Sequence, residues 1–184
     1  MTTRDAINEI LLSINELPLD ATDDITDIQT AIIVNEHLSI AKRRVLSYGW
    51  NFNTTYKSLT PQTNLHIVIP STYLSVDAGA DYDVRQSELF DKVNYTFEFT
   101  DSIDATVIED VDFSDVPYVI ANYIIKEAAL NAYISIIGDD SNVTLRHNAM
   151  VQARNDAFRE NARKIGGNVL TKDYATDLLD RTGI

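Results

Sequence analysis

Apolar residues recur at helical spacing in two stretches before residue 50. The first stretch follows Thr3, an expected N-cap, and is ended by Pro18. Its apolar positions are Ala6, Ile7, Ile10, Leu11, Ile14 and Leu17. The second stretch begins at about Thr26, after an acidic linker, and Gly49 stands where a helix C-terminal cap belongs. Its apolar positions are Ile28, Ala31, Ile32, Leu38, Ala41, Val45 and Tyr48, with Val34 at the edge of the stripe.

Helical spacing returns after residue 113. A third helix is expected to be capped by Ser114 or Asp115 and to stop at Gly138, and its apolar residues cover much of the circumference, which predicts burial on several sides. A fourth helix is predicted from about Asn142 to Ile165 and closed by Gly166-Gly167. Its expected inward positions are Ala149, Met150, Ala153, Ala157 and Ile165. Its other face carries Arg146, Arg154, Arg159, Arg163 and Lys164.

The period changes between residues 51 and 112, where short runs are rich in β-branched and aromatic residues and are punctuated by Pro, Gly, Asp and Asn. The predicted strands are residues 66–69, 73–76, 82–84, 95–99 and 105–111. The predicted fold is therefore mainly α: a helical bundle of about four helices with an inserted small antiparallel β subdomain and an extended C-terminal arm. The expected parts are residues 1–50 and 113–166 for the bundle, 51–112 for the insertion and 167–184 for the arm.

Composition narrows the possible functions. The chain of 184 residues contains no cysteine, which excludes disulfides, thiolate metal sites and cysteine nucleophiles, and its three histidines lie far apart in sequence. A net charge of −13 would repel DNA on average. Neither an apolar run long enough to span a bilayer nor a signal-peptide core appears, so we expect a soluble protein made in a cytoplasm and no membrane partner.

Searches for catalytic motifs find no nucleophile elbow, phosphate loop, dinucleotide fingerprint or zinc-protease signature. The run from Asp110 resembles the start of a calcium loop, but Asp115 and Ala121 occupy the positions that need Gly and Glu. The pairs Asp23-Asp24 and Asp139-Asp140 suit helix caps or turns better than a metal site. We therefore predict no catalytic, metal or cofactor residues and no enzyme activity; the alternative is a carboxylate-metal hydrolase that uses the aspartate clusters.

Two segments are candidates for contact with partners. The arginine face of the fourth helix is interleaved with Asp156 and Glu160 and has no aromatic partners for stacking bases, which favours a subunit contact or a solvated face over nucleic-acid binding. The apolar residues that follow the glycine pair suit a segment that docks, either on a partner or back on its own domain. The candidate interface residues are Arg146, Arg154, Arg159, Leu170, Tyr174, Leu178 and Leu179.

An ordered series of short strings resembles the tail tubular protein A family of short-tailed phages. The helix from Ala6 to Pro18 resembles that family's opening, and Tyr48-Gly49-Trp50-Asn51-Phe52-Asn53, with Leu59 and Pro61, resembles the end of its second helix. The later similar strings are Leu89-Phe90-Asp91-Lys92, Tyr95-Thr96-Phe97, Phe113-Ser114-Asp115-Val116-Pro117, Tyr123-Ile124, Ala128-Ala129 and Gly138-Asp139. One departure is Leu145-Arg146-His147-Asn148, where the family is expected to have an acidic pair.

The resemblance implies an adaptor of the virion neck or tail, present in the host cytoplasm during assembly. In that family twelve subunits form a ring between the portal protein and the tail nozzle protein, with tail fibres as a further partner. Double-stranded DNA passes through the channel without sequence-specific binding. The related alternative is a head-completion protein of the virion neck.

Overall fold

The computed structural model describes residues 1–169, with side chains as far as Lys164, so the predicted arm lies almost entirely outside the described residues. The described chain forms two compact units. The helical unit comprises Met1–Lys42 and the chain from Phe113 onward, and the β unit comprises Arg43–Asp112. The fold is mixed α and β rather than mainly α, because the β unit takes up 70 residues with its own core.

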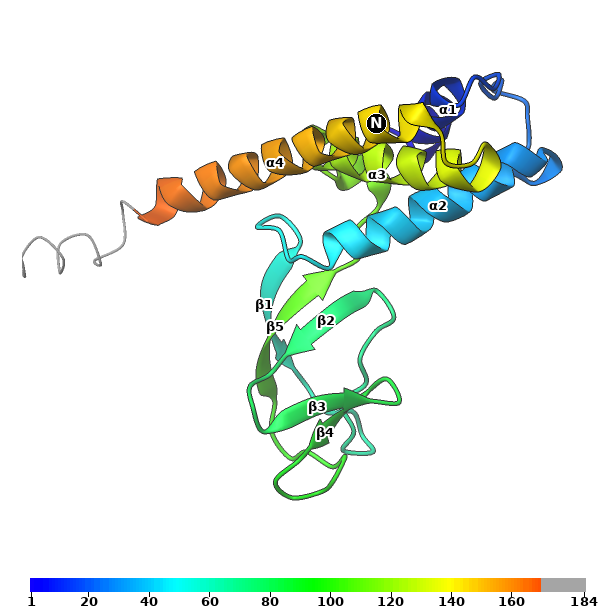
Figure 1. The fold of residues 1–184 in the computed structure, drawn as a ribbon. Coiled ribbons are helices and arrows are strands. Elements are labelled where there is room, and N and C mark those ends of the chain that lie inside the picture. Colours follow the sequence, from blue (N-terminus) through cyan, green and yellow to red (C-terminus); the bar gives the residue numbers. More distant parts are fainter. Residues whose placement is uncertain (170–184) are drawn as a thin grey trace, which may run out of the picture. The chain divides into compact units, whose positions relative to one another are not determined.

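The helical unit contains α1 (Thr3–Ser13), the 3-10 turns η1 (Ile25–Asp27) and η2 (Phe113–Asp115), α3 (Tyr118–Ile136) and α4 (Ser141–Val169). It also contains most of α2 (Gln29–Leu46), whose last turn belongs to the β unit. In Figure 1, α4 runs along α3, and α1 packs against α3.

Helix α1 begins one residue earlier than predicted, at a capping box. The Thr2 hydroxyl accepts a hydrogen bond from the Asp5 amide at 3.1 Å, and the Asp5 carboxylate accepts one from the Thr2 amide at 2.8 Å. The predicted apolar face is buried through Ile14, but Leu17 is 86% exposed. The backbone leaves the helix at Asn15, whose φ is +64°, so the helical period no longer applies at Leu17.

Helix α2 begins later than the sequence indicated, because Asp24 caps the separate turn η1. Val34, expected at the edge of the apolar stripe, is fully buried, whereas Ile28, Ile32 and Tyr48 are exposed. The buried stripe is therefore rotated toward Ala31, Val34, Leu38, Ala41 and Val45. Gly49 has the positive φ that suits a C-terminal cap, +72°, but α2 ends three residues before it, at Leu46.

Helix α3 is buried on several sides, as its broad apolar surface predicted. Its cap differs, because Pro117 occupies the cap position without a side-chain hydrogen bond while Ser114 and Asp115 lie in η2. On α4, Ala153 and Ala157 are buried, but Met150 is half-buried and Ala149 is exposed. Helix α4 also continues past the glycine pair to Val169. Glycine costs a helix only about 1 kcal/mol relative to alanine, so two glycines need not end it.

The β unit has a three-stranded antiparallel sheet in the order β1 (Thr54–Leu59), β5 (Ile103–Glu109), β2 (Tyr73–Asp77). A hairpin joins β3 (Tyr82–Arg85) to β4 (Glu88–Asp91), and its turn residues Gln86 and Ser87 both have positive φ. The core of the unit consists of Leu59, Ile67, Ile69, Leu89, Phe99, Ala105 and Val107.

The sequence predicted β2, β3 and β5 but missed β1 and β4. The predicted strands at 66–69 and 95–99 form only isolated bridges, such as His66 with Glu98 and Asp91 with Thr96. Tyr95 has a φ of +54° and is 82% exposed, which interrupts any strand there. Burial still alternates along residues 66–69, because Ile67 and Ile69 are buried and Val68 is exposed.

A buried asparagine closes the junction between the last turn of α2 and the sheet. The Asn53 side-chain amide donates to the carbonyls of Leu46 at 3.1 Å and Glu109 at 2.9 Å, and its oxygen accepts from the Trp50 amide at 2.9 Å. The indole N–H of Trp50 donates to the Val45 carbonyl at 2.6 Å. A Cβ on Gly49 would lie 3.0 Å from the Ile108 side chain, so this junction tolerates little added volume.

We expect Asn53→Ala to lower the free energy of unfolding of the β unit by about 2–4 kcal/mol, because three hydrogen bonds between a fully buried side chain and main-chain groups are lost. Trp50 is the one tryptophan of the chain and lies within this junction, so its fluorescence during urea unfolding measures the effect directly. Asn155→Ala, at an exposed position on α4, is the control and should change stability by less than about 0.5 kcal/mol. Equal effects of the two substitutions would contradict the role given to Asn53.

Candidate functional site

The helical unit carries two surface grooves at different places along α4. The first, called here the α1–α3–α4 groove, has a volume of about 300 Å³. Its apolar wall comes mainly from α3 and α4, and Leu145 on its edge is 70% exposed. Its lining residues are Glu9, Ser13, Ile125, Lys126, Ala129, Leu130, Asn142, Leu145, Arg146 and Ala149.

Most charged side chains at this groove bind other groups of the same chain. Lys126 forms an ion pair with Glu9 at 2.9 Å, which joins α3 to α1. The Arg146 guanidinium lies 4.0 Å from the centre of the Tyr133 ring and donates to the main-chain carbonyl of Ser13. Its Nε is buried and has no hydrogen-bond partner. Arg146, a predicted interface residue, therefore lies partly buried as a clamp between α4, α3 and the end of α1.

Asp140 begins α4 as a capping residue. Its carboxylate accepts hydrogen bonds from the Tyr133 hydroxyl at 2.8 Å and from the Asn142 amide at 2.8 Å. The Tyr133 hydroxyl bond is the main cause, with the Asn142 bonds, of a pKa held below the usual value of 3.8 for Asp140. The Asp139-Asp140 pair thus contains a helix cap, which is the role that its position in the sequence favoured.

The second groove, called here the α3–α4 groove, has a volume of about 330 Å³ and lies between the start of α3 and the C-terminal half of α4. Arg159 pairs with Asp156 at 3.1 Å, and the more distant Arg163–Glu160 pair is 3.9 Å apart. Both arginines are largely exposed, with 64% and 73% of their side-chain surface accessible. The lining residues are Tyr118, Val119, Asn122, Asp156, Arg159, Glu160 and Arg163.

Aromatic residues beside the arginine face were not identified from the sequence. Tyr118 lines the α3–α4 groove and is 71% exposed, and Arg154 lies 5.4 Å from the centre of the Phe158 ring. The Arg154–Phe158 pair has the i,i+4 spacing of neighbours on a helix, so the sequence contained that signal. Tyr118 is separated from α4 by more than twenty residues, and only the fold brings it there.

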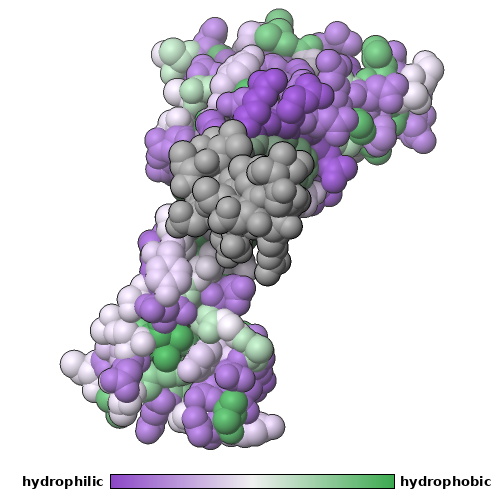
Figure 2. Space-filling model, turned by 90° about the vertical axis from the view of Figure 1, so that its left-hand side faces the viewer, coloured by the Kyte–Doolittle hydropathy of each residue, from purple (hydrophilic) through white to green (hydrophobic). Residues whose placement is uncertain are grey.

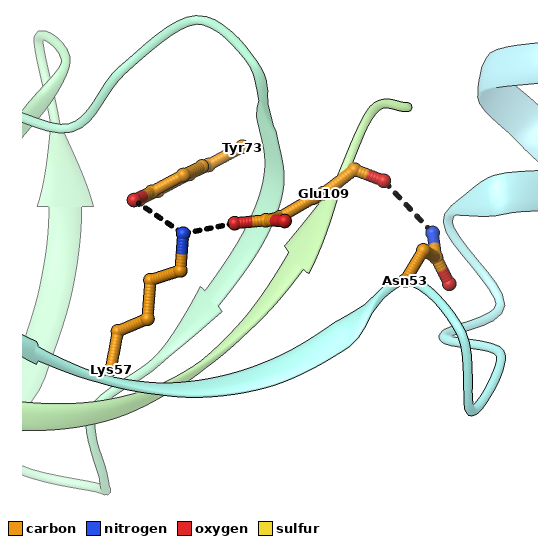
Figure 3. A network of polar contacts seen from close by, with 4 residues as sticks. All are labelled: Asn53, Lys57, Tyr73 and Glu109. Carbon is orange, nitrogen blue, oxygen red and sulfur yellow. Dashed lines mark hydrogen bonds and ion pairs between the residues drawn. The ribbon is translucent and has the colours of Figure 1, made fainter. Parts of the chain in front are cut away.

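In the β unit, a polar network ties the three strands of the sheet together (Figure 3). The Lys57 ammonium on β1 bonds to the Glu109 carboxylate on β5 and lies 3.2 Å from the Tyr73 hydroxyl on β2. These bonds, that of Glu109 first, raise the pKa of Lys57 above its usual value of 10.5. A lysine nucleophile needs the opposite shift, so this arrangement suits a structural tie rather than catalysis.

Within residues 1–169, no group of three or more His, Asp or Glu side chains is placed to hold a metal ion. His66 instead pairs with Glu88 at 2.9 Å and stacks on Phe97. None of the helices described here combines the length and apolar character that crossing a membrane requires. The two grooves of the helical unit are candidate functional features, because their mixed apolar and charged linings suit contacts with other proteins.

The predicted interface residues fall into two groups. Arg159 lines the α3–α4 groove, Arg154 is exposed on the same half of α4, and Arg146 lines the other groove. The structure therefore does not bring the three arginines together on one surface. Leu170, Tyr174, Leu178 and Leu179 lie outside the described residues.

Comparison with known proteins defines the class of protein to which these surfaces belong. A family described as tail tubular protein matches residues 4–166, which include all of the β unit and most of the helical unit. The chain is also 30% identical to tail tubular protein A of Klebsiella phage KP34 over 145 residues, which are 77% of each chain. The protein is thus a structural component of a phage tail. It belongs to the tail tubular protein family.

The Asp140 cap predicts a pH-dependent contribution to stability. Because its pKa is lower in the folded state, Asp140 stabilises the fold above pH 3.8 and loses this effect as the pH falls through the folded pKa. Asp140→Asn should lower the urea midpoint at pH 7, and the difference from the original protein should shrink toward pH 3. Circular dichroism during urea titration measures the midpoint of each protein.

Asp139→Asn is the control, because it removes the same charge at the exposed neighbouring position, and it should have little effect on the midpoint at either pH. A difference for Asp140→Asn that stays constant from pH 7 to pH 3 would contradict the assignment.

Proposed function

We propose that this chain is the adaptor subunit of the phage tail and acts without catalytic turnover. Twelve copies would form a ring between the portal protein and the tail nozzle protein, with tail fibres as a further partner. DNA would pass through the central channel during packaging and ejection. The observation that carries this proposal is membership of the tail tubular protein family over residues 4–166.

The form of the helical unit supports a ring built by one repeated contact. Helix α4 has 29 residues and is about 43 Å long at ~1.5 Å per residue. Its two grooves differ in lining and lie on different parts of the helix. A subunit with two different surfaces can bind its neighbours head to tail, and such a contact closes into a ring when the rotation between copies allows it.

The charge of the protein suits a channel that must not hold DNA. The net charge is −13, and the β unit contributes five Lys or Arg against eleven Asp or Glu. Acidic residues along a channel would repel the phosphates of passing DNA and keep it mobile. We therefore propose that carboxylates line the channel.

Residues 167–184 are proposed to dock on the portal protein. Leu170, Tyr174, Leu178 and Leu179 would supply the apolar surface, and their burial would offset the entropy lost when the segment is held in one conformation. The portal and nozzle would thus contact different parts of the subunit.

Electron microscopy of the purified protein, alone and mixed with the portal of the same phage, tests the proposed function. We expect rings stacked on the portal, formed by the protein alone or after portal is added. A protein that stays monomeric in both samples would overturn the adaptor proposal.

Truncation after Val169 tests the portal contact separately, because it leaves α4 complete. The truncated protein should fold with an unchanged circular dichroism spectrum but should no longer sediment with the portal. A double substitution of exposed residues elsewhere, Gln62→Ala with Thr63→Ala, serves as a control and should sediment normally. Unchanged portal binding by the truncated protein would remove the role given to this segment.

A further inference from the structure

Charge is distributed unevenly over the helical unit. The segment Glu16–Asp27, called here the acidic loop, carries five carboxylates and no Lys or Arg. The stretch of α4 from Arg154 to Lys164, called here the basic end, has four Lys or Arg and two acidic residues. Although the net charge of the protein is −13, this stretch of α4 has a local excess of positive charge, and the α3–α4 groove lies there.

The acidic loop is held firmly against α1. The Asn8 side-chain amide donates to the Leu19 carbonyl at 3.1 Å and accepts from the Leu19 amide at 2.8 Å. The Arg4 guanidinium donates to the main-chain carbonyls of Asp20 and Asp23. Arg4 therefore fixes the backbone of the loop, and the exposed carboxylates of Asp20 and Asp27 face solvent.

The two charged surfaces lie at opposite ends of the helical unit. The bond from Arg146 to the Ser13 carbonyl places the end of α1 beside the first turns of α4. The basic end begins eight residues after Arg146 and stops eighteen residues after it, about 12–27 Å farther along the helix axis. Figure 1 shows the same separation, with the loop between α1 and α2 at one end of the unit and the C-terminal half of α4 at the other.

The cations of the basic end are exposed and can contact a partner. Arg159 and Arg163 are paired with acidic residues of their own helix, but both stay largely exposed. Arg154 and Lys164 add two further cations that are also exposed. The side of the molecule drawn in Figure 2 shows strongly hydrophilic residues gathered on the helical unit.

Apolar side chains accompany the charges on both surfaces. Leu17 in the acidic loop is 86% exposed, the highest value among the large hydrophobic residues described. Tyr118 and Val119 form the apolar part of the α3–α4 groove, whose volume of about 330 Å³ exceeds that of a leucine side chain. A large apolar side chain from one copy that enters a groove on another copy loses its exposure to water, which favours the contact.

We propose that the acidic loop of one copy docks on the basic end of the next copy, with Leu17 in the α3–α4 groove and Asp20 and Asp27 opposite Arg159 and Arg163. Each copy then offers its acidic loop in one direction and its groove in the other, so the contact repeats head to tail. This inference rests on the proposed ring and names the surfaces that form it. DNA is a poorer partner for the basic end, because Asp156 and Glu160 lie among its arginines.

Reciprocal charge reversal in the full chain tests the contact. The groove variant is Arg159→Glu with Arg163→Glu, and the loop variant is Asp20→Lys with Asp27→Lys; the capping carboxylate of Asp24 is left unchanged. Each variant alone should need at least about tenfold more protein for half-assembly, because like charges then face each other. An equimolar mixture should form rings again, since acidic grooves meet basic loops and basic grooves meet acidic loops alternately.

Ring formation, alone and on the portal, is measured by sedimentation velocity and electron microscopy. Arg43→Glu with Lys92→Glu in the β unit changes the net charge as much as the groove variant and should assemble normally. Leu17→Ala changes no charge and should weaken assembly in the same assay.

The outcomes separate this contact from the function on which it rests. If the unmodified protein forms no ring with or without portal, both the ring and the contact are overturned. If it forms rings and either charge-reversed variant assembles equally well, or the mixture fails to recover, only the contact is overturned. If the groove variant forms normal rings but no longer retains DNA, the basic end binds nucleic acid rather than a second copy.

Discussion

The β unit depends on the buried side chain of Asn53, which satisfies main-chain groups from three directions at once. It bonds to the end of α2 through Leu46, to the following turn through Trp50, and to the last strand of the insertion through Glu109. Leaving such groups unpaired in the interior costs more than the bonds themselves contribute. Together with the main-chain pairing of Thr54 with Ile108, this side chain holds the start of β1, the end of β5 and the end of α2 side by side.

The helical unit is organised by the burial of apolar helix faces rather than by a buried polar side chain. Helix α3 is apolar on most of its surface and is covered by its neighbours, while α4 buries only a narrow stripe that includes Ala153 and Ala157. The rest of α4 is therefore available for polar and charged residues along its length. A long helix with one narrow buried face can present different surfaces at its two ends, which is what a repeating assembly contact requires.

The balance of acidic and basic residues differs between parts of the chain. Residues 1–42 hold two Lys or Arg against eight Asp or Glu, and the β unit is similarly acidic, whereas residues 113–184 hold eight against nine. Nearly all of the net charge of −13 thus comes from the first two thirds of the chain. The nearly neutral last third contains α4, so the surface proposed to attract a second copy is separate from most of the acidic residues proposed to repel DNA.

Within the described residues, the sequence by itself determined the four α-helices and three of the five strands, and it also determined the family, because each depends on local periodicity or on an ordered series of residues. It missed β1 and β4, and it placed strands at 66–69 and 95–99, since a strand is defined by its partner across the sheet. Only the tertiary structure decided that Asn53 is buried and that Arg146 is a clamp within the subunit rather than an exposed cation. Only the fold, likewise, brought Tyr118 to the arginines of α4 and put the acidic loop at the other end of the helical unit. These positions depend on contacts between residues far apart in the chain, and the local pattern of hydrophobic and polar residues does not specify such contacts.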